Sequence, residues 1–182
     1  MNIFLVTDLH FNHTDQMVRY CGRPADYEER IFKEMLKLKS TDVLICLGDV
    51  CVGKDAEMHK RYIEPLICRK WLLRGNHDSK TNTWYLNHGW DWVGDWFGLT
   101  TCNKNIIFSH RPTKILDSYD LNIFGHFHNH LPRLLKHNWV VDGEEERNKE
   151  DLEIMSNKHK VLSMEKLDYK LITLENFIYD RY

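Results

Sequence analysis

Five short polar blocks along this chain hold residue types that bind metal ions and transfer protons. The blocks are Asp8-Leu9-His10, Gly48-Asp49, Gly75-Asn76-His77-Asp78, His110 and Gly125-His126-Phe127-His128. Carboxylate oxygens, imidazole nitrogens and one amide oxygen form a ligand set suited to borderline divalent ions such as Mn, Fe, Ni or Zn. The blocks contain no cysteine, which argues against a structural zinc site.

The number of candidate ligands exceeds what a single ion takes. Asp8 and His10 are two residues apart, so they would project to the same side of an extended segment. The same spacing separates His126 and His128. Seven residues fit two metal ions that share a bridging carboxylate. They are Asp8, His10, Asp49, Asn76, His110, His126 and His128.

Apolar segments in the first third of the chain predict how these blocks are positioned. Residues 3–6, 43–47 and 71–73 are short apolar runs typical of strands. Between them, residues 31–36 and 58–67 carry apolar side chains at helical spacing. This β-α-β-α-β order predicts a mainly parallel sheet with helices on both faces.

The later part of the chain is richer in strand signals. Further strands are predicted within residues 90–97, 106–108, 121–124 and 139–141. The acidic stretch 142–153 indicates an exposed loop or helix, and the tail from 161 to 177 returns to apolar residues that pack on the core. Because ligands of α/β sheets bind beyond the carboxyl ends of the strands, we expect the polar blocks to converge on one rim.

In this order, the five blocks resemble the signature of the calcineurin-like metallophosphoesterases: D-x-H, G-D, G-N-H-D/E, H and G-H-x-H. The resemblance spans residues 8 to 128, and the start of the chain is similar to small single-domain members from bacteria and phages. It implies an α/β fold in which two mixed β-sheets pack face to face and are flanked by helices. We expect residues 1–182 to form one such domain.

The resemblance also implies a role for each site residue. His77 would face the phosphate and assist the leaving group, and Asp78 would orient His77. The reaction would be hydrolysis of a phosphodiester by in-line attack of a hydroxide that bridges two divalent ions, with Mn the first candidate and Fe, Ni or Zn the others. One ion would be held by Asp8, His10, Asp49 and His128, and the second by Asp49, Asn76, His110 and His126.

Two other functions remain open at this stage. One is a phosphomonoesterase of the same fold, and the other is a binding module without catalysis. The presence of His77 favours an enzyme. Fifteen residues separate His110 from Gly125, which leaves no room for a cap domain that would enclose a small monoester. A diester is therefore the preferred substrate.

Four further residues are candidates for contact with the substrate. Arg23 and Arg111 could each offer a planar guanidinium to a phosphate, although either could instead have a structural or surface role. Asn12 and His13 follow the first block and could touch the substrate or lie in a solvated loop.

Composition excludes several classes of protein. The net charge of −2 argues against an extended grip on nucleic acid, so the expected partner is a small or short phosphodiester. The longest apolar run has five residues, far fewer than the roughly 20 that cross a membrane. The start of the chain lacks the basic region of a signal peptide. Five scattered cysteines without a C-x-x-C pair indicate reduced thiols and a cytoplasmic location.

Overall fold

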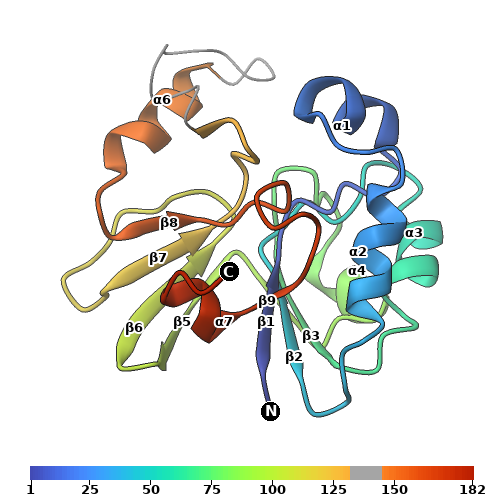
Figure 1. The fold of residues 1–182 in the computed structure, drawn as a ribbon, viewed down its shortest axis with the longest axis horizontal. Helices are drawn as coiled ribbons and strands as arrows, with labels where there is room; N and C mark the ends of the chain where they lie inside the picture. Colours follow the sequence, from blue (N-terminus) through green and yellow to red (C-terminus); the bar gives the residue numbers. More distant parts are fainter. Residues whose placement is uncertain (132–144) are drawn as a thin grey trace.

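Two β-sheets form the centre of the computed structural model, which describes residues 1–131 and 145–182 (Figure 1). Within these residues one sheet has five strands and the other has four. The strand order is β4-β3-β2-β1-β9 in the first sheet and β5-β6-β7-β8 in the second. The bounds are β1 (Ile3–Val6), β2 (Val43–Cys46), β3 (Arg69–Leu73), β4 (Trp92–Gly94), β5 (Trp96–Thr101), β6 (Lys104–Ser109), β7 (Leu121–Phe124), β8 (His159–Val161) and β9 (Ile172–Thr173).

Both sheets are mixed, as the resemblance implied. Strands β1 to β4 are parallel, and β9 runs antiparallel to β1. In the second sheet β6, β7 and β8 are parallel and β5 is antiparallel to β6. The fold class predicted from the sequence, α/β with two mixed sheets and flanking helices, is therefore confirmed.

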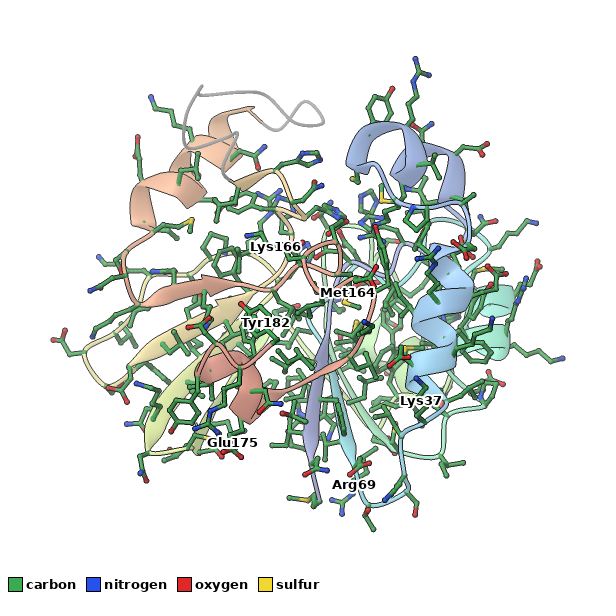
Figure 2. All side chains as sticks on the ribbon, in the orientation of Figure 1. Lys37, Arg69, Met164, Lys166, Glu175 and Tyr182 are labelled. Atoms are coloured by element: carbon green, nitrogen blue, oxygen red, sulfur yellow. The ribbon has the colours of Figure 1, made fainter. Side chains whose placement is uncertain are left out.

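Strand β2 is wholly buried, as are the last two residues of β1 and of β3, and burial on both faces explains the apolar sequences of these segments. Leu5, Ile45 and Leu73 pack towards the second sheet, where they meet Phe108 and Ile123. The alternate positions on the same strands, including Val6, Leu44 and Leu72, pack against helices on the opposite face. Figure 2 shows side chains filling the space between the two sheets.

Helices α2 (Tyr27–Met35), α3 (Asp55–Tyr62) and α4 (Asn82–Leu86) cover the outer face of the first sheet, and α1 (Thr14–Cys21) lies above them in the view of Figure 1 and packs Met17 and Cys21 into the same core. In α2, Tyr27, Ile31 and Met35 recur every four residues and form a buried stripe. The predicted helical segment 31–36 is confirmed in part, since Ile31 and Met35 are buried but Leu36 is 51% exposed at the end of the helix. Helix α6 (Glu145–Ile154) packs Leu152 against the second sheet, and α7 (Leu174–Ile178) contributes Leu174, Phe177 and Ile178 to the core between the sheets. Among the described residues, no helix has the length and apolar character needed to cross a membrane.

The observed elements differ from the sequence-based expectations in helix α1 and in the acidic stretch, and one predicted strand could not be compared. Helix α1 was not predicted, because half of its eight residues are polar and, within it, Met17 and Cys21 alone are buried. The predicted strand at residues 139–141 lies outside the described residues. The stretch 142–153 was expected to be an exposed loop or helix: residues 145–153 do lie in helix α6, but Asn148 and Asp151 are only 4% and 8% exposed, and residues 142–144 lie outside the described residues.

Candidate metal centre

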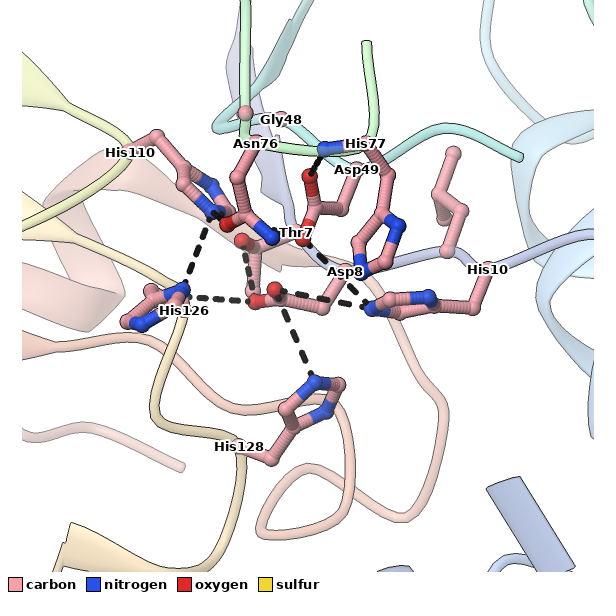
Figure 3. Close-up of polar contacts among 12 residues, drawn as sticks. Thr7, Asp8, His10, Gly48, Asp49, Asn76, His77, His110, His126 and His128 are labelled. Atoms are coloured by element: carbon pink, nitrogen blue, oxygen red, sulfur yellow. Dashed lines mark hydrogen bonds and ion pairs between the residues drawn. The ribbon is translucent and has the colours of Figure 1, made fainter. Parts of the chain in front are cut away.

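All five polar blocks follow directly on the carboxyl ends of strands. Three blocks follow β1, β2 and β3, which are parallel neighbours. The other two follow β6 and β7, which are parallel neighbours in the second sheet. The seven predicted metal ligands are thereby brought into two adjoining groups, which Figure 3 shows around Asp8 and Asp49.

The first group consists of Asp8, His10 and His128. Asp8 Oδ1 lies 4.0 Å from His10 Nε2 and 3.8 Å from His128 Nε2. Asp8 Oδ1 and both ring nitrogens of His10 are buried and have no hydrogen-bond partner among the described residues. Leaving such atoms unpaired costs free energy. A divalent cation would satisfy the carboxylate oxygen and the ring nitrogen that face each other, so this group fits a metal ion.

The second group consists of Asp49, His110 and His126, with Asn76 beside them. His110 Nε2 lies 3.4 Å from Asp49 Oδ2 and 3.3 Å from His126 Nδ1. Asn76 Oδ1 is 3.0 Å from the same His110 nitrogen. One carboxylate, two imidazoles and one amide oxygen suit a borderline divalent ion.

Asp49 lies between the two groups. Its Oδ2 is 3.6 Å from His10 Nε2 in the first group and 3.4 Å from His110 Nε2 in the second. Burial alone would raise the pKa of Asp49, but the neighbouring His110 and His10 outweigh burial and lower that pKa well below its usual range. An ionised carboxylate therefore faces both groups.

The ligands leave their strands through left-handed backbone rather than extended backbone. The φ angles are 49° at Asp8, 46° at His10, 57° at Asp49, 66° at His126 and 46° at His128. Our expectation that Asp8 and His10, like His126 and His128, share a side through extended spacing was therefore wrong in its cause. Non-glycine residues adopt such angles at a cost, and these costs concentrate at functional sites.

Two motif glycines allow close approach of the ligand loops. A Cβ on Gly75 would lie 2.1 Å from Asp49 Oδ1, and a Cβ on Gly125 would lie 1.9 Å from Thr7 Oγ1. Thr7 in turn donates a 2.6 Å hydrogen bond to Asp8 Oδ2, which also accepts from the His126 amide at 3.0 Å. These contacts orient Asp8 so that Oδ1 faces the histidines.

The outer nitrogen of His110 is fixed by the main chain. His110 Nδ1 lies 2.7 Å from the carbonyl oxygen of Leu47, so Nδ1 donates and Nε2 faces the second group. Burial would lower the pKa of His110, but the charge of Asp49 outweighs burial and raises that pKa to about 9. The Nε2 atom of His110 thus points towards Asp49 and the second group.

Arg23 lies behind the site, which does not favour the predicted contact with substrate. Its side chain is completely buried and pairs with Glu165, with 2.8 Å between Arg23 Nη2 and Glu165 Oε1. Glu165 Oε1 is also 3.1 Å from His128 Nδ1. Burial would raise the pKa of Glu165, but His128 and Arg23 lower it well below its usual range. Sequence reasoning missed Glu165, because no motif distinguishes it from Asp168 and Glu175, the other acidic residues of the tail.

Arg111 lies beside the second group and is paired with a carboxylate. Its Nη1 is 2.6 Å from Asp151 Oδ2 and 3.4 Å from Asn148 Oδ1. Asn148 Oδ1 also lies 3.4 Å from His126 Nε2. Asn148 and Asp151 were missed because their stretch of sequence is acidic and polar throughout.

His77 lies next to both groups. Its ring is 5.1 Å from that of His10, and it offers a nitrogen within 4.8 Å of ligand atoms of His10 and Asp49.

The structure corrects the role expected for Asp78. Its carboxylate accepts hydrogen bonds from the amides of Asp49, Gly75 and Val50 at 2.7, 2.8 and 3.1 Å. Asp78 therefore joins two ligand loops instead of orienting the His77 ring.

Asn12 and His13 lie at the side of the site where a pocket opens. The ring of His13 is 5.6 Å from that of His10, and the Asn12 side chain donates to the carbonyl oxygen of Val52 at 2.8 Å. The pocket has a volume of about 510 Å³ and is lined by residues from this loop and from α1, α2 and α3. These include Asn12, His13, Glu28, Lys54 and Arg61.

Comparison with known proteins decides the family of this chain. A sequence model described as calcineurin-like phosphoesterase matches residues 1–173. The chain belongs to this family. It is accordingly a metal-dependent phosphoesterase, and the two ligand groups are candidate sites for the divalent metals that the family uses.

Individual relatives are more distant. An uncharacterized protein of Methanocaldococcus jannaschii is 26% identical over 183 residues, which cover 95% of this chain and 87% of that protein. A protein of unknown function from Aquifex aeolicus is 25% identical, and its crystal structure superposes with a TM-score of 0.68 over 100% of this chain and 99% of that one. An archaeal phosphodiesterase is 18% identical, with a TM-score of 0.45 over 69% of this chain and 72% of that one. This last similarity says nothing about the substrate of the present chain.

Proposed function

We propose that this protein is a dinuclear-metal phosphoesterase that prefers phosphodiesters. One observation supports the dinuclear centre most directly: the same Asp49 oxygen lies within 3.6 Å of His10 in one ligand group and within 3.4 Å of His110 in the other. A carboxylate placed between two groups of candidate ligands is suited to bridging two cations.

Each ion would have its own ligands and share Asp49. When bound, the two ions would supply positive charge for the phosphoryl oxygens and lower the pKa of a coordinated water. Oxygen and nitrogen donors without thiolates suit Mn, and Fe, Ni and Zn are further candidates. Asp8, His10, Asp49 and His128 would hold one ion, and Asp49, Asn76, His110 and His126 the other.

His77 would act on the leaving group. In hydrolysis a water oxygen bonds to phosphorus, the bond from phosphorus to the leaving oxygen breaks, and the leaving oxygen needs a proton. The His77 side chain is half-buried beside both ligand groups, so it can reach substrate without being enclosed. A proton donated from an imidazole at this position would accelerate the reaction by about 10²–10⁴-fold.

The preference for diesters is supported by the pairing of the two arginines with carboxylates. A monoester carries more negative charge than a diester, and additional cations would have to balance that charge. Arg23 is paired with Glu165 and Arg111 with Asp151, so neither brings a net positive charge to the site. The pocket beside Asn12 and His13 gives one ester arm a place to extend away from the ions.

The substrate preference is tested by comparing kcat/KM for bis-p-nitrophenyl phosphate and p-nitrophenyl phosphate, with Mn²⁺ at neutral to mildly alkaline pH. We expect the higher value for the diester. A higher value for the monoester would favour a phosphomonoesterase, and turnover of neither compound with both ions bound would favour a binding module. Asp49→Asn, which removes the charge of the proposed bridge, is the inactive control.

We further propose a small or short phosphodiester as the physiological partner, since the net charge of −2 offers little attraction to a long nucleic-acid backbone. A cytoplasmic location is supported by the five cysteines, all of which are free thiols. A single domain over residues 1–182 is supported by the core that both sheets share.

A further inference from the structure

A buried carboxylate lies against the outer nitrogen of His128. Glu165 Oε1 is 3.1 Å from His128 Nδ1, while His128 Nε2 faces Asp8 Oδ1 at 3.8 Å. The second oxygen of Glu165 accepts a 2.8 Å hydrogen bond from Ser163 Oγ. Both oxygens of the carboxylate are therefore held in place.

Arg23 completes this arrangement from the other side. Its Nε and Nη2 both lie 2.8 Å from Glu165 Oε1, and its guanidinium carbon is 4.8 Å from the centre of the Tyr27 ring. Arg23 Nη2 is also 3.1 Å from His128 Nδ1. The same histidine nitrogen therefore faces both an acceptor, Glu165, and a donor, Arg23.

We propose that Glu165 is a positioning residue that determines which nitrogen of His128 is available for metal. An imidazole that binds a cation through Nε2 must carry its proton on Nδ1, and that proton needs an acceptor. Glu165 is that acceptor, and Arg23 holds Glu165 in place. The proposal rests on the metal site assigned above.

The pairing has a consequence that a purely structural ion pair would not have. If Glu165 loses its charge, Arg23 becomes the dominant neighbour of His128 Nδ1. Arginine only donates, so it stabilises the tautomer in which Nδ1 accepts and Nε2 carries the proton. That tautomer cannot bind a cation through Nε2. Removal of the Arg23 charge should therefore restore part of the metal affinity that is lost with the Glu165 charge.

A separate cation site at this position is disfavoured. Cys21, His128 and Glu165 offer three potential ligand atoms within 4.8 Å of one another. The Arg23 guanidinium, however, is 2.8 Å from Glu165 and 3.1 Å from His128, so a positive charge already occupies the position. The carboxylate therefore serves the histidine and not an ion of its own.

The test is calorimetric titration of metal-stripped protein with Mn²⁺ at one fixed pH. His128→Ala identifies the ion that this histidine holds. We expect Glu165→Gln to weaken binding of the same ion by about 10–100-fold and to leave the other ion unchanged. The double variant Arg23→Met with Glu165→Gln should bind this ion more tightly than Glu165→Gln alone. Glu165→Asp keeps the charge, so its Mn²⁺ affinity should lie between those of wild type and Glu165→Gln. This variant replaces Glu165→Gln in the comparison if Glu165→Gln does not fold.

Asp42→Asn is the matched control. Asp42 is a buried carboxylate that accepts from the amides of Asn2 and Lys39 at 3.1 and 3.0 Å, at the opposite end of β2. Its loss should lower the melting temperature and leave both Mn²⁺ affinities unchanged. Wild-type affinity for the His128-dependent ion in folded Glu165→Gln would overturn the inference, as would no gain in the double variant. If wild-type protein binds one ion, the dinuclear proposal fails, and the comparison of Glu165→Gln with His128→Ala still decides the role of Glu165.

Discussion

At the scale of single residues, the site depends on a few atoms that are buried without protein partners. Asp8 Oδ1 and the ring nitrogens of His10 are the clearest examples within the described part of the chain. Their desolvation is costly in the metal-free protein, so metal binding should stabilise the fold. His77, beside the same atoms but more exposed, is suited to a different task.

We predict that His77→Ala lowers kcat by about 10²-fold or more while both ions remain bound. The loss should be larger for a diester with an alkyl leaving group than for one with p-nitrophenol, because a poor leaving group depends more on proton donation. Steady-state kinetics on the two substrates, with metal content determined in parallel, measures this. Loss of one ion from the variant would show instead that His77 is a ligand.

Gly125 lies where the protein has no space for a side chain. An added Cβ would lie 1.9 Å from Thr7 Oγ1 and 2.7 Å from Asp8 Oδ2, so Gly125→Ala must displace Asp8. We expect weaker Mn²⁺ binding and a loss of unfolding free energy of about 1–3 kcal/mol, measured by calorimetric titration and by denaturant unfolding.

Gly98→Ala is the matched control, because its added Cβ would meet the end of the Tyr119 side chain at 2.5 Å in strand β5, away from the ligand loops. Tyr119 can move, so both ions should bind with unchanged affinity. Wild-type Mn²⁺ affinity in Gly125→Ala would contradict the account of the loop packing.

At the scale of elements, helix α6 adds to the site from outside the motif blocks. Asn148 Oδ1 lies 3.4 Å from His126 Nε2, and His126 Nδ1 faces His110. An acceptor on the outer nitrogen fixes the proton there and leaves Nδ1 for the ion. Asp151, one turn further along the helix, pairs with Arg111 and ties α6 to the loop after β6.

We therefore predict that Asn148→Ala lowers the affinity for the ion held by Asp49, His110 and His126 by about tenfold. The value of kcat/KM should fall as well. Titration with Mn²⁺ and diester kinetics measure the two effects. Glu150→Ala, an exposed change in the same helix, should alter neither. Equal Mn²⁺ affinity and equal kcat/KM in the two variants would show that Asn148 does not contribute to the site.

At the scale of the whole molecule, two sheets bring five strand ends to one edge, and this arrangement could be predicted from the sequence. The strands at residues 3–6 and 43–46 are continuous apolar runs, and the ligands follow them in the order of a specific motif. Helix α1, which buries only Met17 and Cys21, gives no such signal. The left-handed backbone at Asp8 and Asp49 was also not predictable, because aspartate tolerates this conformation but does not require it.

Partnerships between distant residues account for the rest of what the sequence did not reveal. Arg23 lies 142 positions before its partner Glu165, and Arg111 lies 40 positions before Asp151. Nothing in either local sequence indicates such a pairing. Both arginines were therefore interpreted as candidate phosphate ligands, whereas their positions depend on how the C-terminal quarter packs.

Whether two metal ions share Asp49 can be seen in a crystal structure of the protein grown with excess Mn²⁺. Anomalous difference maps at the manganese edge locate the ions independently of the protein model. We predict two peaks, both in contact with the Asp49 carboxylate, one beside His10 and His128 and the other beside His110 and His126. A single peak, or two peaks of which one does not contact Asp49, would contradict this prediction.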